Sequence, residues 1–155
     1  MQKPTKFWAL PLMFLAVMAA SVACSGSGAK GGVNDTIYLE SGVKYLYMNK
    51  GEGLAVDSGS QVVSHINLMV GEDTIWNTYN PEDKLEFTAK VTSLIAGFDE
   101  AVMFARQGDR LMIVIPPELG YGAEGRPPVV PPNATLLFDI DFLEVEAPAV
   151  ASEEN

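Results

Sequence analysis

The 155-residue sequence contains one cysteine and one histidine. A single cysteine excludes an internal disulfide framework, and one histidine leaves neither a Cys/His metal cluster nor a histidine to spare for a Cys-His or Ser-His-Asp catalytic set. Basic residues are also scarce, because 10 Lys and Arg stand against 20 Asp and Glu, a formal net charge of −10. Since phosphate binding needs a basic face, this charge argues against a nucleic-acid partner. We expect no metal and no cofactor.

Residues 1–23 have the pattern of a secretory signal. Two lysines precede the apolar stretch FWALPLMFLAVMAA, which is shorter than the about 20 residues that a membrane-spanning helix needs. Cys24 follows at the place where bacterial lipoprotein signals put the cysteine that is lipidated after cleavage. Ser21 departs from the leucine that is usual three residues before that cysteine, and a plain secretory signal with an incidental cysteine is the alternative. The lipoprotein interpretation predicts an extracytoplasmic protein of the bacterial cell envelope, anchored to the membrane through Cys24.

The rest of the chain divides into a tether, one domain and a tail. Residues 24–36 include SGSGAKGG, which has the composition of a flexible tether. Residues 148–155 are predicted to be disordered. The 155 residues, 48% of them hydrophobic, are enough for one globular domain in addition to the predicted signal sequence. We assign that domain to residues 37–147.

Within the domain the sequence predicts five or six strands and one short helix. The helix has Thr92 or Ser93 as its cap and Gly108 as its stop. Its apolar residues at helical spacing are Ile95, Phe98, Val102 and Ala105. Strand patterns occupy residues 43–47, 61–70, 75–76, 85–87, 110–115 and 134–145. The polar phase of the last strand flips beyond Phe142, which indicates either a bulge or the end of regular pairing. This order predicts an α+β fold, an antiparallel sheet with one helix packed on a single face.

The last apolar third, residues 119–142, reads LGYGAEGRPPVVPPNATLLFDIDF. It begins with a Gly-rich turn around Tyr121 and continues into a Pro-flanked loop that carries Val129 and Val130. Because proline cannot donate a backbone hydrogen bond and holds φ near −65°, we expect a stiff, exposed flap. A flap that holds two valines outward beside a tyrosine would form the rim of a hydrophobic binding cleft.

Two other patterns in this region do not indicate chemistry. Its glycines form G-x-G-x-x-G, but Pro127 and Pro128 follow where a dinucleotide-binding motif needs a helix. Asp139 and Asp141 alternate with apolar residues of the last strand, so we expect them to be solvated on its polar face rather than catalytic.

Residues 117–142 closely resemble the C-terminal signature of the FKBP-type peptidyl-prolyl cis-trans isomerases, the macrolide-binding immunophilins. The shared features are a Y-G-A turn, G-x-P, two apolar residues, P-P-x-A-T-L and a strand with F-D, and the resemblance extends from about Gly42 to Glu146. It implies the family's antiparallel sheet wrapped on one short helix. It also implies an isomerase of X-Pro bonds in Pro-containing clients, here secreted or envelope proteins, and macrolides as inhibitors.

The resemblance further implies a shallow apolar cleft that receives a prolyl ring. Without it, each aromatic residue of the domain would be interpreted as ordinary core. The family's lining positions are taken by Trp76, Leu85, Phe87, Leu94, Ile95, Phe98, Tyr121, Val130 and Phe138, with Arg126 and Val129 on the loop. By the same resemblance, the Ile95 N–H and the Tyr121 hydroxyl bond the carbonyls that flank the proline, and Phe98 supplies the floor.

Some positions depart from the family pattern. His65 stands where the family usually has a tyrosine, and Asn77 where it usually has an aspartate that lies close to that tyrosine. An amide keeps an acceptor that imidazole can use, so we expect the cleft to survive and its activity to fall. For His65 a structural role is the alternative to a catalytic one, and a His65 that lined the cleft would make turnover vary between pH 5 and 8. Phe98, where many members have tryptophan, and Arg126, where histidine is frequent, should affect macrolide affinity and sequence preference first.

Prolyl isomerisation needs no acid, base or nucleophile. The barrier of ~18 to 20 kcal/mol comes largely from amide resonance, and an apolar cleft that desolvates the amide and fits its twisted form lowers it by differential binding. The alternative function is a catalytically weak or inactive FKBP-fold binding module, a chaperone that grips Pro-containing or unfolded segments. His65 and Asn77 favour that alternative, whereas the set of Tyr121, Ile95 and Phe138 favours the enzyme.

Overall fold

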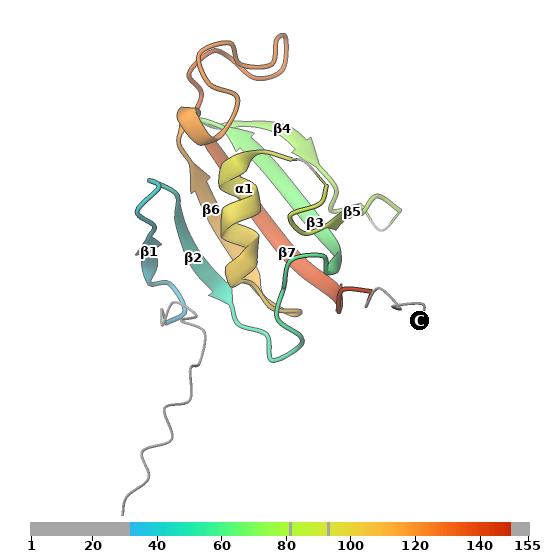
Figure 1. Ribbon diagram of the computed structural model, residues 1–155. Helices are drawn as coiled ribbons and strands as arrows, with labels where there is room; N and C mark the ends of the chain where they lie inside the picture. The colour runs from blue at the N-terminus through green and yellow to red at the C-terminus, as the bar shows by residue number, and fades with distance from the viewer. Residues whose placement is uncertain (1–31, 81, 93, 150–155) are drawn as a thin grey trace, which may run out of the picture.

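The computed structural model describes residues 32–80, 82–92 and 94–149 (Figure 1). The predicted signal sequence, the lipidation site Cys24 and most of the predicted tether and tail lie outside the described residues. No helix in the described part of the chain is both long and apolar enough to cross a membrane.

The described residues form seven strands of one antiparallel sheet, in the order β1-β2-β6-β7-β3-β4, with β5 also paired to β3 (Figure 1). The strands are β1 (Thr36–Tyr38), β2 (Lys44–Asn49), β3 (Gln61–Val70), β4 (Asp73–Asn77), β5 (Leu85–Thr88), β6 (Arg110–Ile115) and β7 (Leu136–Glu146). The α+β class, the antiparallel sheet and the six predicted strand positions are confirmed. The seventh strand, β1, was not predicted, because three residues are too short to show a period-two pattern.

One helix, α1 (Ala96–Ala101), packs across the sheet and continues into the 3₁₀ turn η1 (Val102–Phe104) (Figure 1). The predicted cap is wrong: Ile95 is the N-cap and gives no side-chain hydrogen bond, while the Thr92 hydroxyl accepts from the backbone N–H of Thr88 at 3.0 Å. The predicted stop is late as well, because Ala105 already has an extended backbone three residues before Gly108. The chain therefore enters α1 without a polar cap.

Close packing of α1 on the sheet depends on Gly97. A Cβ at this position would overlap the Cγ2 of Ile115 on β6 and would lie 3.2 Å from side-chain atoms of Val43 and Leu119. The helix face that results is fully covered, since Phe98, Ala101 and Val102 are at most 1% exposed. This contact fixes the start of α1, and with it Ile95 and Phe98, against the sheet.

The last strand, β7, carries the alternation that the sequence predicted. Every second residue from Leu136 to Phe142 is buried. Between Phe142 and Glu144 the register with β3 shifts by one residue, after which Val145 is the buried residue. The predicted bulge is confirmed, and it keeps the strand's apolar side on the core despite the flip in sequence phase.

Candidate functional site

An open cleft with a volume of about 410 Å³ lies where the start of α1 meets the sheet and the loop that precedes β7. It is lined by Leu68 of β3, Ile75 and Trp76 of β4, Leu85 of β5, Leu94, Ile95 and Phe98 at the start of α1, Tyr121, Arg126, Val129 and Val130 of the loop, and Phe138 of β7. Nine of these twelve side chains are hydrocarbon only, and just Trp76, Tyr121 and Arg126 carry polar atoms. Such a cavity fits an apolar group that is oriented by a few polar contacts.

Aromatic rings make the floor of the cleft. Phe98 is 1% exposed, and its ring centroid lies 5.1 Å from that of Phe138 and 5.5 Å from that of Phe87. The interplanar angles of 56° and 68° are tilted and edge-on arrangements, which aromatic pairs prefer over a face-to-face sandwich. Phe87 is not among the lining residues, so its predicted place in the cleft is wrong. Phe87 is buried and packs edge-on against Phe98.

The loop between η2 (Pro117–Leu119) and β7 closes one side of the cleft and holds its two valines differently. Val129 is 46% exposed, whereas Val130 is 2% exposed. The expectation that both valines point outward is therefore wrong for Val130. The backbone of Arg126 exchanges hydrogen bonds of 2.8 and 2.9 Å with that of Val130, which closes a tight hairpin and turns the second valine inward. Val129 and the 45% exposed Trp76 form the apolar rim.

The Tyr121 hydroxyl and the backbone N–H of Ile95 are hydrogen-bonding groups of cleft residues that have no partner among the described residues. Ile95 has an extended backbone (φ −122°, ψ 146°), and its carbonyl accepts from the N–H groups of Phe98 and Asp99 at 3.0 Å. The first turn of α1 thus uses the Ile95 carbonyl and leaves its N–H for a ligand.

The structure does not bring His65 and Asn77 to the cleft. His65 lies on β3 between the buried Ser64 and Ile66, so its side chain is on the other face of the sheet, where its ring centroid is 5.4 Å from that of Tyr79. The Nδ1 atom of His65 is buried and has no hydrogen-bond partner among the described residues. Because neighbouring residues of a strand face opposite sides, His65 cannot stand for a tyrosine of the family's cleft.

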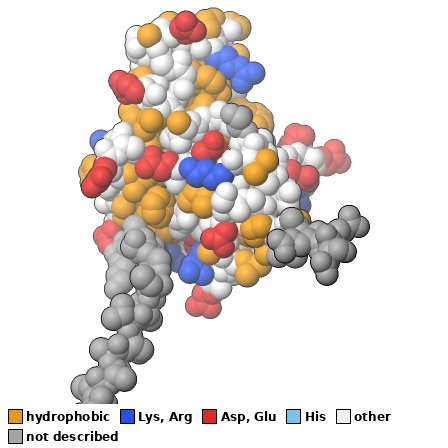
Figure 2. All heavy atoms as spheres, viewed as in Figure 1, with side chains coloured by type: hydrophobic (Ala, Val, Ile, Leu, Met, Phe, Trp, Pro, Cys, Tyr) orange, Lys and Arg blue, Asp and Glu red, His pale blue; other side chains and the backbone are white. Residues whose placement is uncertain are grey.

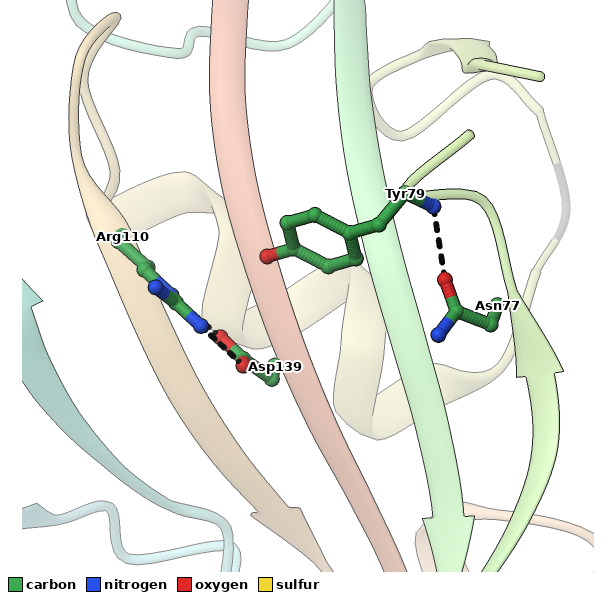
Figure 3. A network of polar contacts seen from close by, with 4 residues as sticks. All are labelled: Asn77, Tyr79, Arg110 and Asp139. Carbon is green, nitrogen blue, oxygen red and sulfur yellow. Dashed lines mark hydrogen bonds and ion pairs between the residues drawn. The ribbon is translucent and has the colours of Figure 1, made fainter. Parts of the chain in front are cut away.

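Asn77 ends β4 and holds the following turn. Its Oδ1 accepts from the backbone N–H of Tyr79 at 2.7 Å (Figure 3). The next residue, Thr78, is buried, and its hydroxyl accepts from the backbone N–H of Ile66 at 2.8 Å. The expected pairing of Asn77 with His65 is therefore absent from the described structure. Asn77 and Thr78 instead accept hydrogen bonds from backbone N–H groups, which stabilise the turn that follows β4.

The outer face of the sheet carries its own polar network (Figure 3). Arg110 of β6 donates two hydrogen bonds to Asp139 of β7, at 2.9 and 2.6 Å, and its guanidinium lies 5.8 Å from the Tyr79 ring centroid. The expectation that Asp139 is solvated is wrong, because its side chain is 13% exposed and ion-paired. The bonds to Asp139 raise the pKa of Arg110, and burial, followed by the charge of Asp139, raises the pKa of Tyr79 to about 12.

Leu68 and Ile75 line the cleft and were not among the predicted site residues. Leu68 has a sequence signal, since the period-two pattern of residues 61–70 places it on the same face as Val62 and Ile66. The short β4 offers no such pattern for Ile75. No group of three or more His, Cys, Asp or Glu side chains in the described ranges is placed to hold a metal ion.

Comparison with known proteins identifies the family to which the chain is similar. The family model described as FKBP-type peptidyl-prolyl cis-trans isomerase matches residues 53–143. The isomerase FkpA of Escherichia coli strain K12 is 34% identical over 107 residues, which are 68% of this chain and 38% of FkpA. Fkbp12 of Drosophila melanogaster is 32% identical over 107 residues, 68% of this chain and 99% of that protein.

A solved structure agrees with these sequences. The crystal structure of FkpA from Escherichia coli has a TM-score of 0.68 at 29% identity, and the match covers 75% of this chain and 54% of that one. The sequence match covers 38% of the length of FkpA, so the similarity concerns part of that relative. Because the family model covers more than half of the chain and the fold agrees, the chain belongs to the family of FKBP-type peptidyl-prolyl cis-trans isomerases.

Proposed function

We propose that this protein catalyses cis-trans isomerisation of X-Pro peptide bonds in polypeptide clients. The observation that carries the proposal is the apolar cleft with an aromatic floor, beside which the Ile95 N–H and the Tyr121 hydroxyl have no partner among the described residues. A prolyl ring is apolar and compact, and the two carbonyls that flank it need hydrogen-bond donors once they leave water. The cleft offers both.

The mechanism works by differential binding of the twisted amide. The prolyl ring rests on Phe98, and the apolar walls remove water from the X-Pro amide. Desolvation disfavours the charge-separated resonance form that keeps the amide planar, and donors from Ile95 and Tyr121 hold the flanking carbonyls while the bond rotates. Each hydrogen bond contributes about 0.5 to 1.5 kcal/mol, so the shape and dryness of the cleft must supply most of the effect. No proton is transferred.

The proposal includes a place for this activity. The pattern of residues 1–24 supports a lipid anchor at Cys24, and the clients would then be secreted or envelope proteins outside the cytoplasm. Expression of the full chain in a bacterium, followed by mass spectrometry of the mature N-terminus, tests this part. A lipid-modified Cys24 is expected, and the Cys24→Ser variant should lack it. An unmodified N-terminus in the wild type would contradict the anchor.

The catalytic proposal is tested with residues 25–155. The described residues within this range contain the whole sheet and α1, and Fkbp12 matches over 99% of its own length, so the domain is a self-contained unit. Isomerisation of a Leu-Pro tetrapeptide is compared for the wild type, Tyr121→Phe and, as a matched control, Tyr79→Phe on the outer face. We expect the wild type to accelerate isomerisation, Tyr121→Phe to lower kcat/KM by about 2- to 10-fold, and Tyr79→Phe to leave it unchanged.

A binding module without catalysis is the second candidate, because Asn77, next to the rim residue Trp76, replaces the carboxylate that is usual in the family. Trp76 is the one tryptophan of residues 25–155 and lines the cleft, so its fluorescence reports occupation of the cleft by a peptide or by a macrolide. Peptide binding without acceleration in the wild type, with acceleration restored by Asn77→Asp, would establish the binding module instead. Acceleration by the wild type excludes it.

A further inference from the structure

Arg126 is the one charged side chain among the described residues that line the cleft. Arg126 is exposed and forms no ion pair within the described part of the chain. Arg110, in contrast, donates two hydrogen bonds from its guanidinium to the carboxylate of Asp139. The chain as a whole is acidic, since it has 20 Asp and Glu against 10 Lys and Arg. Figure 2 shows acidic side chains scattered over one face of the molecule and hydrophobic ones on and below the loop between η2 and β7.

The backbone around Arg126 is fixed. Gly125 has a φ of +64°, and a Cβ there would lie 2.5 Å from the carbonyl oxygen of Val130, so this hairpin needs glycine. The two backbone hydrogen bonds between Arg126 and Val130 then close the turn, and the buried Val130 anchors it to the cleft. The loop thus presents a cation at a defined place on the rim, beside a site that takes an apolar ring.

We propose that Arg126 makes this cleft select clients with a carboxylate side chain, Asp or Glu, directly next to the proline. The inference rests on the proposed function, because the prolyl ring in the cleft is what brings the neighbouring side chain to the rim. A guanidinium presents a planar fork of donors that matches a carboxylate. The net negative charge of the chain repels acidic peptides at long range, but salt screens charges further away than about 8 Å, and Arg126 is the one charged side chain among the described residues that line the cleft.

The test compares tetrapeptides that differ by one neutral isostere. Residues 25–155 are assayed with Glu-Pro and Gln-Pro peptides, and with Pro-Glu and Pro-Gln peptides, to locate the side on which the carboxylate is read. The measured quantity is the ratio of kcat/KM for the Glu peptide to that for the Gln peptide. We expect a ratio of about 2 to 5 on one side, which corresponds to an exposed ion pair. This ratio should fall towards 1 as the NaCl concentration is raised from about 10 mM to about 500 mM, because salt screens the ion pair.

Three variants separate a contact from a general charge effect. Arg126→Gln should bring the ratio to about 1, and Arg126→Lys should keep part of it, because the charge remains and the fork is lost. Lys44→Gln removes the same charge from an exposed position on β2, away from the cleft, and should keep the wild-type ratio. A wild-type ratio of 1 or below, or an equal ratio in wild type and Arg126→Gln, overturns the inference. If Leu-Pro peptides are still turned over in that case, the proposed isomerase function is unaffected.

Failure of the isomerase itself has a different signature. If no peptide is turned over, the proposed catalytic function fails, and the inference is decided by binding of the same peptides measured through Trp76 fluorescence. Tighter binding of the Glu peptide that disappears in Arg126→Gln supports the selection of carboxylates. Equal binding of Glu and Gln peptides overturns it.

Discussion

The two faces of β3 and β7 carry different chemistry on the same backbone. On the inner face Phe138 contacts Phe98, and the cleft above them leaves the Tyr121 hydroxyl without a partner among the described residues. One residue further along β7, on the outer face, Asp139 is held by two hydrogen bonds from Arg110. On the inner face the Tyr121 hydroxyl is thus left open beside an apolar cleft, whereas on the outer face Arg110 and Asp139 are paired with each other, although the Nδ1 atom of His65 has no partner there among the described residues.

This difference separates stability from function. A polar group that is already bound within the protein, such as the carboxylate of Asp139, has little left to offer a ligand, whereas an unpartnered hydroxyl beside an apolar floor does. Changes on the outer face should therefore alter the free energy of unfolding and spare turnover. Changes on the inner face should alter both. Variants of residues 25–155 can break or sharpen this contrast.

The largest expected effect is on the inner face, from Phe98→Ala. Phe98 is 1% exposed between Phe87 and Phe138, and removal of a buried aromatic ring leaves a cavity that costs about 3 to 5 kcal/mol. On the outer face, Leu137→Ala removes a half-buried side chain next to Phe138 and should cost about 1 kcal/mol or less. Urea unfolding followed by circular dichroism measures both. Equal losses would show that the two faces are packed alike.

A smaller loss is expected when the outer ion pair is broken. Arg110→Met leaves Asp139 without its partner, and because the side chains are 43% and 13% exposed, the cost should lie between that of a surface pair and that of a buried one, about 1 to 2 kcal/mol. The double variant Arg110→Met, Asp139→Leu should recover part of it. Turnover of a Leu-Pro peptide should not change, and a loss of kcat/KM beyond the loss of folded protein would contradict the separation of the faces.

The sequence predicted the inner face better than the outer one, for a physical reason. Alternation along a strand is a local pattern, so the buried residues of β7, including Phe138, could be assigned without knowledge of their neighbours. The ion pair of Asp139 depends on Arg110, 29 residues earlier, being placed on the adjacent strand. A pattern in one segment contains no information about that pairing.

Within the site the errors have a common origin in register. His65 was assigned to the cleft, although a shift of one residue along β3 moves every side chain to the opposite face. The burial of Val130 has a similar cause, because it depends on hairpin hydrogen bonds with Arg126 that the prolines around it do not reveal. The motif indicated which elements meet at the cleft, and only the fold determines which side chain of each element enters it.

At alkaline pH the outer face should lose a small part of its stability through Tyr79. Burial and the nearby Asp139 raise the pKa of Tyr79 to about 12, above the value of about 10 in an unfolded chain. The folded protein therefore holds this proton more tightly, so the contribution is fully present below pH 10 and is lost as the pH rises from about 10 to 12. Tyr79 is 39% exposed, and screening by water limits the loss to about 1 kcal/mol or less. Unfolding measured from pH 8 to about 11.5 should decline more in wild type than in Tyr79→Phe, and parallel curves would contradict this assignment.

The smallest expected effect is that of His65 on turnover. His65 is on the outer face against Tyr79, and the backbone of β3 separates it from the cleft, whose lining contains no histidine, carboxylate or cysteine among the described residues. Protonation of an imidazole there changes no contact that a bound proline makes, so kcat/KM for a Leu-Pro peptide should be flat between pH 5 and 8, the range in which histidines usually titrate. His65→Phe keeps a ring against Tyr79 and should change kcat/KM by less than about 2-fold. A pH dependence that His65→Phe abolishes would mean that a group on the outer face affects turnover in the cleft. The separation of stability on the outer face from function on the inner face would then be wrong.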